Sequence, residues 1–533
     1  MQKQLTLKLL PSEAANETIV KNLIALSEAT EPQAVNGYHI LKKSIDARSH
    51  QPWVNLRILA YINEPVHAVN KKIDLLLKNV HQATKQIIII GAGPAGLFAA
   101  LTLLKNGIKP IILERGKDVR SRRRDLAMLN KEGIVNPDSN YCFGEGGAGT
   151  YSDGKLYTRS HKRGNVQRIL QLFHYFGAGE EILYEAHPHI GTNKLPGIIT
   201  SIREKITEYG GQICFQEKVT DLIVQNDVLH GVVTANGDKY RADSVILATG
   251  HSARDIFELL YKKNIHIGAK PFALGVRVEH PQSIIDKIQY HCNTRDRFLP
   301  PAAYSLVHRV NNRGVFSFCM CPGGIIAPAS TNNDELVVNG WSPSKRNNPF
   351  ANSGIVVEVS ENDIKDLKDF EKITGARKSI LTTALSMMYF QKYVERKAHQ
   401  AGGGKIVAPA QRLADFCENK LSSSLPGCSY LPGIHSSLLK EVLPGAVYLA
   451  LRAGFKEFGK KMKGYYTNEA VVVAAESRTS SPVRIPRNKE TLEHPQIRNL
   501  YPCGEGAGYA GGIVSAAMDG EKVASVIAEK IQR

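Results

Sequence analysis

Residues 85–115 read KQIIIIGAGPAGLFAALTLLKNGIKPIILER, and this stretch decides the fold. Ile87 to Ile90 form a short apolar run of β-branched residues, which is typical of a strand buried on both faces of a parallel sheet. Three glycines follow in the spacing G-x-G-x-x-G. Gly91 allows a tight turn, Gly93 lets the backbone approach a phosphate, and Gly96 lets the next helix pack against the strand.

The residues after the glycines continue the same unit. Leu97 to Leu104 are predicted to form a helix whose free N-terminal amides favour a pyrophosphate. A second apolar strand, Ile111 to Leu113, ends on Glu114, 18 residues beyond Gly96. An acidic side chain at that distance can accept hydrogen bonds from a ribose. We therefore predict a βαβ unit that binds an adenine dinucleotide.

The glycine pattern alone is weak, because it also occurs at Gly144 and at Gly506. Neither of those copies has a buried strand before it and a second strand that ends in an acid. The charge-free stretch from Ile87 to Leu104 is 18 residues long, near the usual length of a membrane span. Its three glycines, its proline and its strand-then-helix pattern argue against a span, so we expect none.

Composition bounds the remaining possibilities. The 533 residues suggest two to four domains, and the formal net charge is +18. That charge could reflect acidic substrates, nucleic acid or a membrane surface, but we expect an ordinary basic surface because the densest cluster is only RSRRR at 120–124. The 8 cysteines lack disulfide or zinc spacing, and the N-terminus lacks an export signal. We expect a reducing, cytoplasmic environment.

The chain divides into four predicted segments. Residues 1–84 form a small β-α-β-β domain and linker, with a connecting helix over Lys71 to Gln82. Residues 85–250 are the first part of the dinucleotide-binding domain. Residues 251–490, which mix strands and loops, form an inserted α+β domain. Residues 491–533 return to the first domain, so the fold is α/β with a discontinuous Rossmann-like domain.

Two further stretches point to ligand contacts. Residues 149–155 read GTYSDGK, a near match to a phosphate-binding loop, but Leu156 replaces the metal-binding hydroxyl and no buried strand precedes it. We reject nucleotide hydrolysis and expect backbone close to a ligand. After a predicted three-stranded antiparallel flap, the strand Val245 to Leu247 ends at Ala-Thr-Gly, 248–250, where open α/β sheets bind ligands.

The order of these pieces resembles a known superfamily. GAGPAG with Glu114, the flap with its ATG turn, a long insertion and the terminal GEGAGYAGGI together resemble the FAD-dependent oxidoreductases with two dinucleotide-binding folds, the superfamily of glutathione reductase and the flavoprotein hydroxylases. The strings FGEGGAGTYSDGKL, PHIGTNKL, KPFALGVRVEH, FSFCMCPGG and RTSSPVRI are similar to a bacterial family of uncharacterised FAD-dependent dehydrogenases. The resemblance covers residues 85–530 and implies an FAD site, but no substrate.

The resemblance also implies a role for individual residues. The pyrophosphate would lie against Gly91, Gly93, Ala95 and Gly96. The adenosine would meet Glu114 through its ribose, Arg115 and the backbone of Val219, while Thr249 and Gly250 line the ADP moiety. Gly147 and Gly149 would lie beside the flavin or its phosphates. The ribityl chain and the pyrimidine end would meet Gly504, Glu505, Gly512 and Ile513.

The reaction is less well specified. No second dinucleotide unit for NAD(P)H is visible, so either a substrate reduces the flavin directly or NAD(P)H enters an open pocket. Cys319 and Cys321 alternate on a predicted strand, which places both sulfurs on one face. They could form a redox pair, although packing is the more ordinary role.

Other polar residues have equally open roles. His187 and His189 share the same alternation, but no third ligand with metal spacing is apparent, and we predict no metal. His251 could act as an acid or base or simply end its loop. Arg478 and Arg484 could bind an acidic substrate. No catalytic residue is assigned.

The sequence therefore predicts an FAD-dependent oxidoreductase, of dehydrogenase or reductase type, acting on an unidentified small molecule. The alternatives are an RNA-handling flavoprotein, such as a tRNA-modifying enzyme, and a binding or scaffold protein in which FAD is structural.

Overall fold

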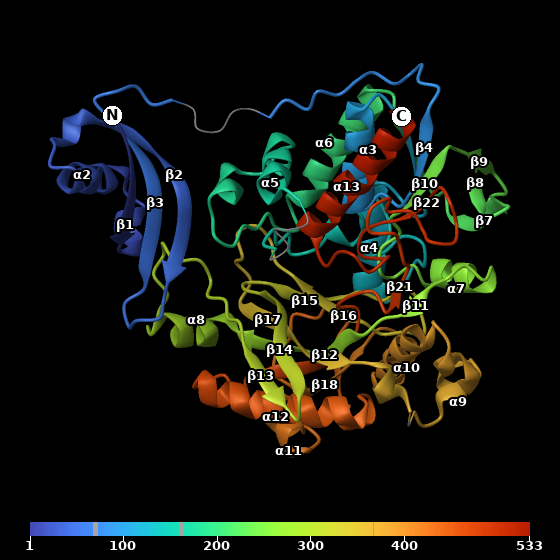
Figure 1. The fold of residues 1–533 in the computed structure, drawn as a ribbon. Coiled ribbons are helices and arrows are strands. Elements are labelled where there is room, and N and C mark those ends of the chain that lie inside the picture. Colours follow the sequence, from blue (N-terminus) through green and yellow to red (C-terminus); the bar gives the residue numbers. More distant parts are fainter. Residues whose placement is uncertain (68–72, 159–163, 366, 533) are drawn as a thin grey trace.

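The structure, a computed structural model, describes residues 1–67, 73–158, 164–365 and 367–532. The dinucleotide domain is built on a five-stranded parallel sheet in the order β22-β10-β4-β5-β6 (Figure 1). The strands are β4 (Gln86–Ile90), β5 (Lys109–Glu114), β6 (Gln212–Phe215), β10 (Ser244–Leu247) and β22 (Leu500–Pro502). This confirms the predicted βαβ unit and the return of the C-terminal segment to the same sheet.

Helices cover one face of this sheet. They are α3 (Pro94–Lys105), α5 (Val166–Tyr175), α6 (Leu195–Glu208) and α13 (Ile513–Gln532). The helices α3 and α13 cross closely at Gly520. This approach is possible because Gly520 has no side chain: a Cβ there would strike the backbone of Ala95. Packing this tight joins the first and last parts of the domain into one core.

The other face of the sheet carries the flap and a short helix. The flap is an antiparallel sheet of β7 (Val219–Gln225), β8 (Val228–Thr234) and β9 (Lys239–Arg241), as predicted. Helix α7 (Arg254–Lys262) buries Phe257 and Leu260 in the same cluster as Ile88. Residues just after the ATG turn therefore pack on the dinucleotide domain.

The second domain is a seven-stranded sheet in the order β13-β14-β17-β12-β20-β18-β19. Its strands are β12 (Phe272–Pro281), β13 (Val307–Val310), β14 (Arg313–Cys321), β17 (Phe350–Val359), β18 (Ala408–Arg412), β19 (Ile434–Ser436) and β20 (Val471–Glu476). All neighbours are antiparallel except β18 and β19. A ribbon of β15 (Ile325–Pro328) and β16 (Val338–Trp341) lies between this sheet and the dinucleotide domain (Figure 1).

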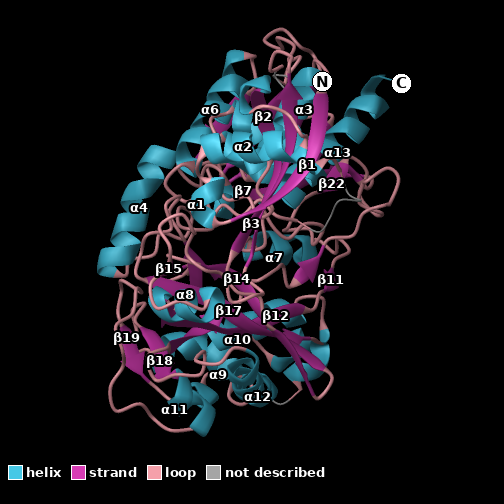
Figure 2. Ribbon diagram, turned by 90° about the vertical axis from the view of Figure 1, so that its left-hand side faces the viewer, coloured by secondary structure: helices cyan, strands magenta, loops and turns pink. Residues whose placement is uncertain are grey.

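Helices surround the second sheet and connect it to the first domain. They are α8 (Gln282–Tyr290), α9 (Phe370–Thr374), α10 (Ser386–Ala401), α11 (Leu413–Glu418) and α12 (Gly445–Lys461). Helix α4 (Val119–Glu132) runs along one side of the molecule (Figure 2), and its Leu126 and Leu129 join the second core. The two-residue strands β11 (Gly268–Ala269) and β21 (Val483–Arg484) pair where the chain enters and leaves the domain.

The N-terminal domain has the predicted β-α-β-β order. Its sheet, β1-β3-β2, is formed by β1 (Gln2–Leu9), β2 (Val35–Asp46) and β3 (Trp53–Ile62), and it packs on α1 (Pro11–Ala14) and α2 (Glu17–Ser27). Backbone hydrogen bonds join Lys43 to Tyr184 and Ala186, both at 2.9 Å. Figure 1 shows this domain beside the two larger ones.

The predicted connecting helix is wrong. Lys71 and Lys72 lie outside the described residues, and residues 73–80 form neither helix nor strand. Ile73, Leu75 and Leu77 alternate with polar residues and pack against the dinucleotide core, so the apolar period is two rather than 3.6. None of the described helices is both long and apolar enough to cross a membrane.

Candidate functional site

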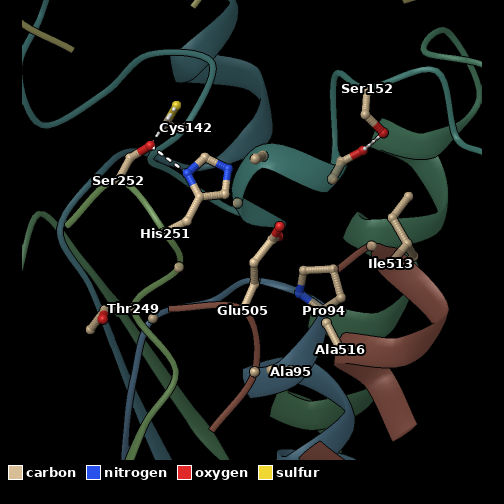
Figure 3. Close-up of a pocket in the computed structure, with 18 of the residues that line it drawn as sticks. Pro94, Ala95, Cys142, Ser152, Thr249, His251, Ser252, Glu505, Ile513 and Ala516 are labelled. Atoms are coloured by element: carbon tan, nitrogen blue, oxygen red, sulfur yellow. Dashed lines mark hydrogen bonds between the residues drawn. The ribbon is translucent and has the colours of Figure 1, made fainter. Parts of the chain in front are cut away.

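A cavity of about 730 Å³ lies between the dinucleotide domain and the second domain. It opens at the carboxyl ends of β4, β5 and β10, the edge at which parallel sheets bind ligands. Every predicted cofactor residue except Gly96 lines this cavity. The predicted contacts with the cofactor itself stay predictions, but the fold brings nearly all of these residues together (Figure 3).

The first glycine turn behaves as the sequence predicts. Gly91 has φ +104°, and a side chain there would lie 2.5 Å from the carbonyl oxygen of Ala248. A side chain at Gly96 would strike the carbonyl of Gly91, so this glycine sits beneath the turn and not in the cavity. At Gly93 a Cβ would meet nothing within 4 Å, because the residue faces the open cavity. The turn therefore keeps space free for a ligand.

Glu114, at the end of β5, lines the cavity and also binds backbone amides of the surrounding turns. Glu114 is buried, and its carboxylate accepts hydrogen bonds from the amides of Ala92 (2.8 Å), Gly116 and Gly144 (both 2.9 Å). It thereby ties the first glycine turn to the glycine-rich loop at 144–149. The predicted ribose contact is untested.

Arg115 is held in place by two carboxylates. Its guanidinium pairs with both oxygens of Asp255 at 2.7 and 2.9 Å, and its Nε donates to Asp138 at 3.1 Å. The group lies 4.4 Å from the ring centre of Phe143, a cation–π contact. The flat guanidinium face is thus fixed at the end of the cavity where Val219 also lies.

A buried arginine fixes the loop at 144–149, and sequence reasoning missed it. Arg122 is fully buried and donates to the carbonyl oxygens of Asn140 (2.8 Å), Glu145 (2.8 Å) and Gly147 (2.9 Å). It belongs to the RSRRR cluster that looked like a charged surface. Its position in the apolar stripe of α4, with Val119, Leu126 and Leu129, was the available signal.

The C-terminal turn closes the cavity opposite the first one. The amide of Gly504 donates to Asp519 at 2.8 Å, and Asp519 is held by Arg487 at 2.6 Å. The carboxyl group of Glu505 projects into the cavity (Figure 3). Burial raises the pKa of Glu505 to about 7, against the opposing influence of Lys270. Near neutral pH this group can therefore either donate or accept a hydrogen bond.

Two polar oxygens in the cavity wall lack a partner. Among the described residues, the buried oxygens Thr249 Oγ1 and Glu217 Oε2 accept or donate no hydrogen bond. Both residues line the cavity. Because a buried polar atom without a partner costs free energy, a polar group of a ligand or a bound water would stabilise this part of the wall.

The remaining wall of the cavity combines side chains of the second domain with Asp153 and Lys155 from the first. Lys155 Nζ lies 3.3 Å from Asp153 and 3.6 Å from both Cys319 Sγ and Cys321 Sγ, and it donates to the carbonyl oxygen of Met320. Cys319 lines the cavity, whereas Cys321 is fully buried. The predicted shared face of the two sulfurs is confirmed by their separation of 4.0 Å.

Arg277 supports this wall from behind. It is fully buried and donates to Glu476 at 2.7 Å, to Asn352 at 2.6 Å and to the carbonyl of Cys319 at 3.4 Å. No sequence motif marks Lys155 and Arg277 as partners of the cysteines, because they come from distant segments.

A buried ion network joins the two domains beside the cavity. Glu395 accepts hydrogen bonds from Arg254 and from Arg478, both at 2.9 Å, and Glu335 pairs with the same two arginines at 3.0 and 3.2 Å. Although burial alone would raise it, the two arginines lower the pKa of Glu395 to about 2. Arg478 is thus committed to these carboxylates, whereas Arg484 stacks on Tyr509 at 4.2 Å and stays accessible.

The candidate histidines differ in position. His251 lines the cavity, where its Nδ1 lies 2.8 Å from Ser252 Oγ (Figure 3). Burial, together with Arg478 and Arg254, lowers the pKa of His251 to about 4, so the ring is neutral at pH 7. His189 lies 3.7 Å from Asp153 and His187 against Tyr157. The part of the chain that the structure describes contains no group of three metal-ligating side chains.

Comparison with known proteins identifies the domain families that the chain matches and a close relative in sequence. Residues 85–269 match the family model "Pyridine nucleotide-disulphide oxidoreductase" and residues 271–479 match "FAD-dependent protein, C-terminal domain-like". Residues 1–61 match a domain of unknown function. An uncharacterised protein of Clostridium beijerinckii is 40% identical over 515 residues, which is 92% of this chain and 92% of that protein.

Two solved structures resemble the chain at low sequence identity. A geranylgeranyl bacteriochlorophyll reductase-like protein of Thermoplasma acidophilum is 12% identical, with a TM-score of 0.35 over 84% of this chain and 79% of that one. Glycine oxidase of Bacillus cereus is 13% identical, with a TM-score of 0.29 over 84% and 96%. Likenesses this weak carry no information about the reaction.

The two matching family models have the fold of an FAD-dependent oxidoreductase, and the relative is similar over nearly its whole length. The chain therefore belongs to the same family as the Clostridium beijerinckii protein, its matched domains are those of FAD-dependent oxidoreductases, and FAD is its cofactor.

Proposed function

We propose that this protein is an FAD-dependent dehydrogenase or reductase that exchanges electrons with a small molecule bound against the second domain. One observation carries the proposal. The cavity that contains the glycine turns continues onto the wall formed by Lys155, Cys319 and Glu476. A cofactor held by the first domain would therefore face side chains of the second.

The residues present fit FAD. The open space at Gly93 would accommodate the pyrophosphate, the N-terminus of α3 would stabilise its charge, and Thr249 Oγ1 and Glu217 Oε2 have no hydrogen-bond partner in the protein. Glu505 projects from the opposite turn with a carboxyl group that can be protonated near neutral pH. When bound, the flavin supplies the electron-transfer chemistry, and the protein supplies position and field.

The second domain shapes the substrate end. Asn339 on β16 is exposed to the cavity, and Thr479 and Arg478 lie in the same wall. The neutral ring of His251 can accept a proton there, while the cationic group of Lys155 favours a negatively charged or polarisable group. These residues would orient a polar small molecule.

Anaerobic spectroscopy tests the proposal. The purified holoprotein is titrated with NADH and with NADPH, and the photoreduced protein is mixed with quinone, enone and disulfide acceptors. We expect at least one pair of donor and acceptor to bleach and then restore the flavin absorbance. If no acceptor restores the absorbance faster than oxygen-free buffer, the flavin is structural and the proposal fails.

A blocking variant tests the location of the substrate. Asn339→Trp fills the second-domain end of the cavity, and Val307→Trp places the same side chain on an exposed position of β13. We expect both variants to retain FAD, and only Asn339→Trp to slow reoxidation by the acceptor, about tenfold or more. Equal rates in the two variants would place the substrate elsewhere.

A further inference from the structure

The two cysteines on β14 occupy a distorted part of the strand. The pairing of β14 with β17 shifts register between Phe318 and Cys321, which is a β-bulge. Cys319 has φ +49°, a backbone conformation that non-glycine residues rarely adopt. Bulges and strained residues often re-aim a side chain at a functional site. Here the bulge turns Cys319 to the cavity and keeps its sulfur 4.0 Å from that of Cys321.

A cation lies between the two sulfurs. Lys155 Nζ is equidistant from them, at 3.6 Å, and its side chain is one-third exposed to the cavity (34%). Arg277 donates to the carbonyl of Cys319 and so holds the bulge in place. An ammonium group this close stabilises a thiolate relative to a thiol.

The charged groups around the sulfurs carry a net positive charge. The cations are those of Lys155, Arg277 and Arg346, and the carboxylates are those of Asp153 and Glu476. His189, which also faces Asp153, is neutral at pH 7 because burial and Arg346 lower its pKa to about 4. Three cations and two carboxylates leave one positive charge, which one thiolate would neutralise.

The two thiols have opposite acidities. The hydrogen bond from Cys321, together with Lys155 and Arg277, holds the pKa of Cys319 well below its ordinary value despite its burial. Burial holds the pKa of Cys321 well above its ordinary value. The accessible sulfur is thus the ionised one, and the buried sulfur carries the proton.

From this cluster we infer that Cys319 is a nucleophilic thiolate, positioned by Lys155 and resolved by Cys321, and that the substrate is a small-molecule disulfide. This inference rests on the proposed function, because it names the substrate class of the same cavity. It differs from a generic dithiol centre in that both cysteines belong to the second domain and not to the dinucleotide domain.

The exchange balances within the site. The thiolate of Cys319 attacks one sulfur of the substrate, a bond forms between the two sulfurs, and the substrate disulfide breaks to release one thiolate. The sulfur of Cys321 then attacks Cys319, a Cys319–Cys321 disulfide forms, and the second half of the substrate leaves. The proton of Cys321 ends on one of the two released thiolates.

The protein must then be reduced again. Restoring one thiolate and one thiol from the disulfide takes two electrons and one proton, which reduced FAD can provide. A bridge between residues i and i+2 is strained, and strained disulfides are more readily reduced than relaxed ones. This spacing, unsuited to a structural bridge, suits a disulfide that must reopen in every cycle.

The first test measures the reactivity of Cys319 in the holoprotein. Iodoacetamide labelling is followed by peptide mass spectrometry between pH 5.5 and 9, with Cys142, which lines the same cavity, as an internal reference for access. An ordinary thiol with a pKa of about 8.5 is only about 3% ionised at pH 7. We expect the Cys319 rate to stay nearly constant down to pH 6.5.

Lysine variants test the positioning role. In Lys155→Met the Cys319 rate should fall about tenfold per pH unit below pH 8, whereas Lys155→Arg should restore most of the flat profile. Thermal melts verify that both variants are folded. A wild-type rate that already falls tenfold per unit, or an unchanged profile in Lys155→Met, would overturn the thiolate assignment.

The second test uses bis(2-hydroxyethyl) disulfide as the substrate probe. We expect the wild-type protein to lose two hydrogens and form a Cys319–Cys321 disulfide, and Cys321→Ser to trap one hydroxyethylthio group on Cys319. Labelling at any other cysteine in place of Cys319 contradicts the inference. These outcomes are read on the cysteines themselves, so they can fail while another acceptor still reoxidises the flavin, and they can succeed in a protein whose flavin never turns over.

Discussion

The two walls of the cavity are built on different principles. The wall from the dinucleotide domain consists mainly of backbone: Gly91, Gly93 and Gly147 line the cavity, and a Cβ at Gly93 would meet only open space. The opposite wall consists of charged and sulfur-bearing side chains, among them Lys155 of the first domain and Cys319 of the second. The first wall is suited to holding a cofactor, and the second is suited to chemistry on a substrate.

The largest effect is expected where the backbone wall is filled. Gly93→Val places a branched side chain in space that is open to the cavity, so the flavin content of the purified protein should fall at least about tenfold, or roughly 1.4 kcal/mol in binding. Gly427→Val is the matched control, because a Cβ there also meets nothing within 4 Å but lies outside the cavity wall. Full flavin content in Gly93→Val would show that this turn does not hold the cofactor.

The stability of the buried ion network beside the charged wall should depend on pH, whereas the backbone wall has no such dependence. The pKa of Glu395 is about 2 in the folded protein and about 4.3 in an unfolded chain, so its contribution to stability is complete above pH 4.3 and is lost as the pH falls towards 2. Removing one partner of a buried ion pair costs about 3 to 5 kcal/mol. Glu395→Gln should therefore lower the thermal midpoint by about 6 °C or more at pH 7.

That difference should shrink at low pH. Thermal melts of the wild type and of Glu395→Gln are compared at pH 7 and pH 3.5, with the exposed Glu204→Gln as the control. A gap between wild type and Glu395→Gln that is as large at pH 3.5 as at pH 7 would contradict the ionised role of Glu395.

Arg122 is a side chain on which the backbone wall depends, because it donates hydrogen bonds to backbone carbonyl groups of that wall and its neighbouring loop. Arg122→Met removes a donor from three carbonyl groups; that of Glu145 keeps its hydrogen bond from Thr150, and each buried group left unpaired costs about 1 to 3 kcal/mol. We expect a drop of several degrees in the thermal midpoint and weaker FAD binding. Arg124→Met, an exposed neighbour on α4, should change neither. Equal effects of the two variants would mean that Arg122 does not organise the loop at 144–149.

The smallest effect is expected from the chemical wall itself. Cys319→Ser preserves shape and removes only the ionisable sulfur, so flavin content should equal that of the wild type and the thermal midpoint should move by less than about 3 °C. Absorbance at the flavin band, relative to protein, measures the content. A flavin-free Cys319→Ser protein would show that the second domain also holds the cofactor.

The contrast between the walls also explains what the sequence could predict. The backbone wall follows from local spacing, because the strand, turn, helix and acid of residues 85–115 contact one another within one unit. The second wall depends on contacts across the chain: Lys155 is 164 residues from Cys319, and Glu395 is 83 from Arg478. No short motif records such pairs.

Two segments show what the periodicity of apolar residues could not predict about backbone conformation. The alternation of Cys319 and Cys321 predicted a shared face, but the bulge and the left-handed backbone at Cys319 arise from pairing with β17. Ile73, Leu75 and Leu77 were assigned to a helix, whereas they belong to an irregular segment that packs on the dinucleotide core. The domain limits, the cofactor contacts and the cytoplasmic location stay predictions, and so does the RNA-handling alternative.

A crystal structure of the FAD-loaded protein tests the central claim, that one cavity joins a cofactor-holding wall to a chemical wall. We predict that the adenine lies at the Arg115 and Val219 end, the pyrophosphate against Gly93, and the flavin ring next to Lys155 and Cys319. A flavin ring at the Arg115 end, or one separated from the second domain by the loop at 144–149, would contradict the claim.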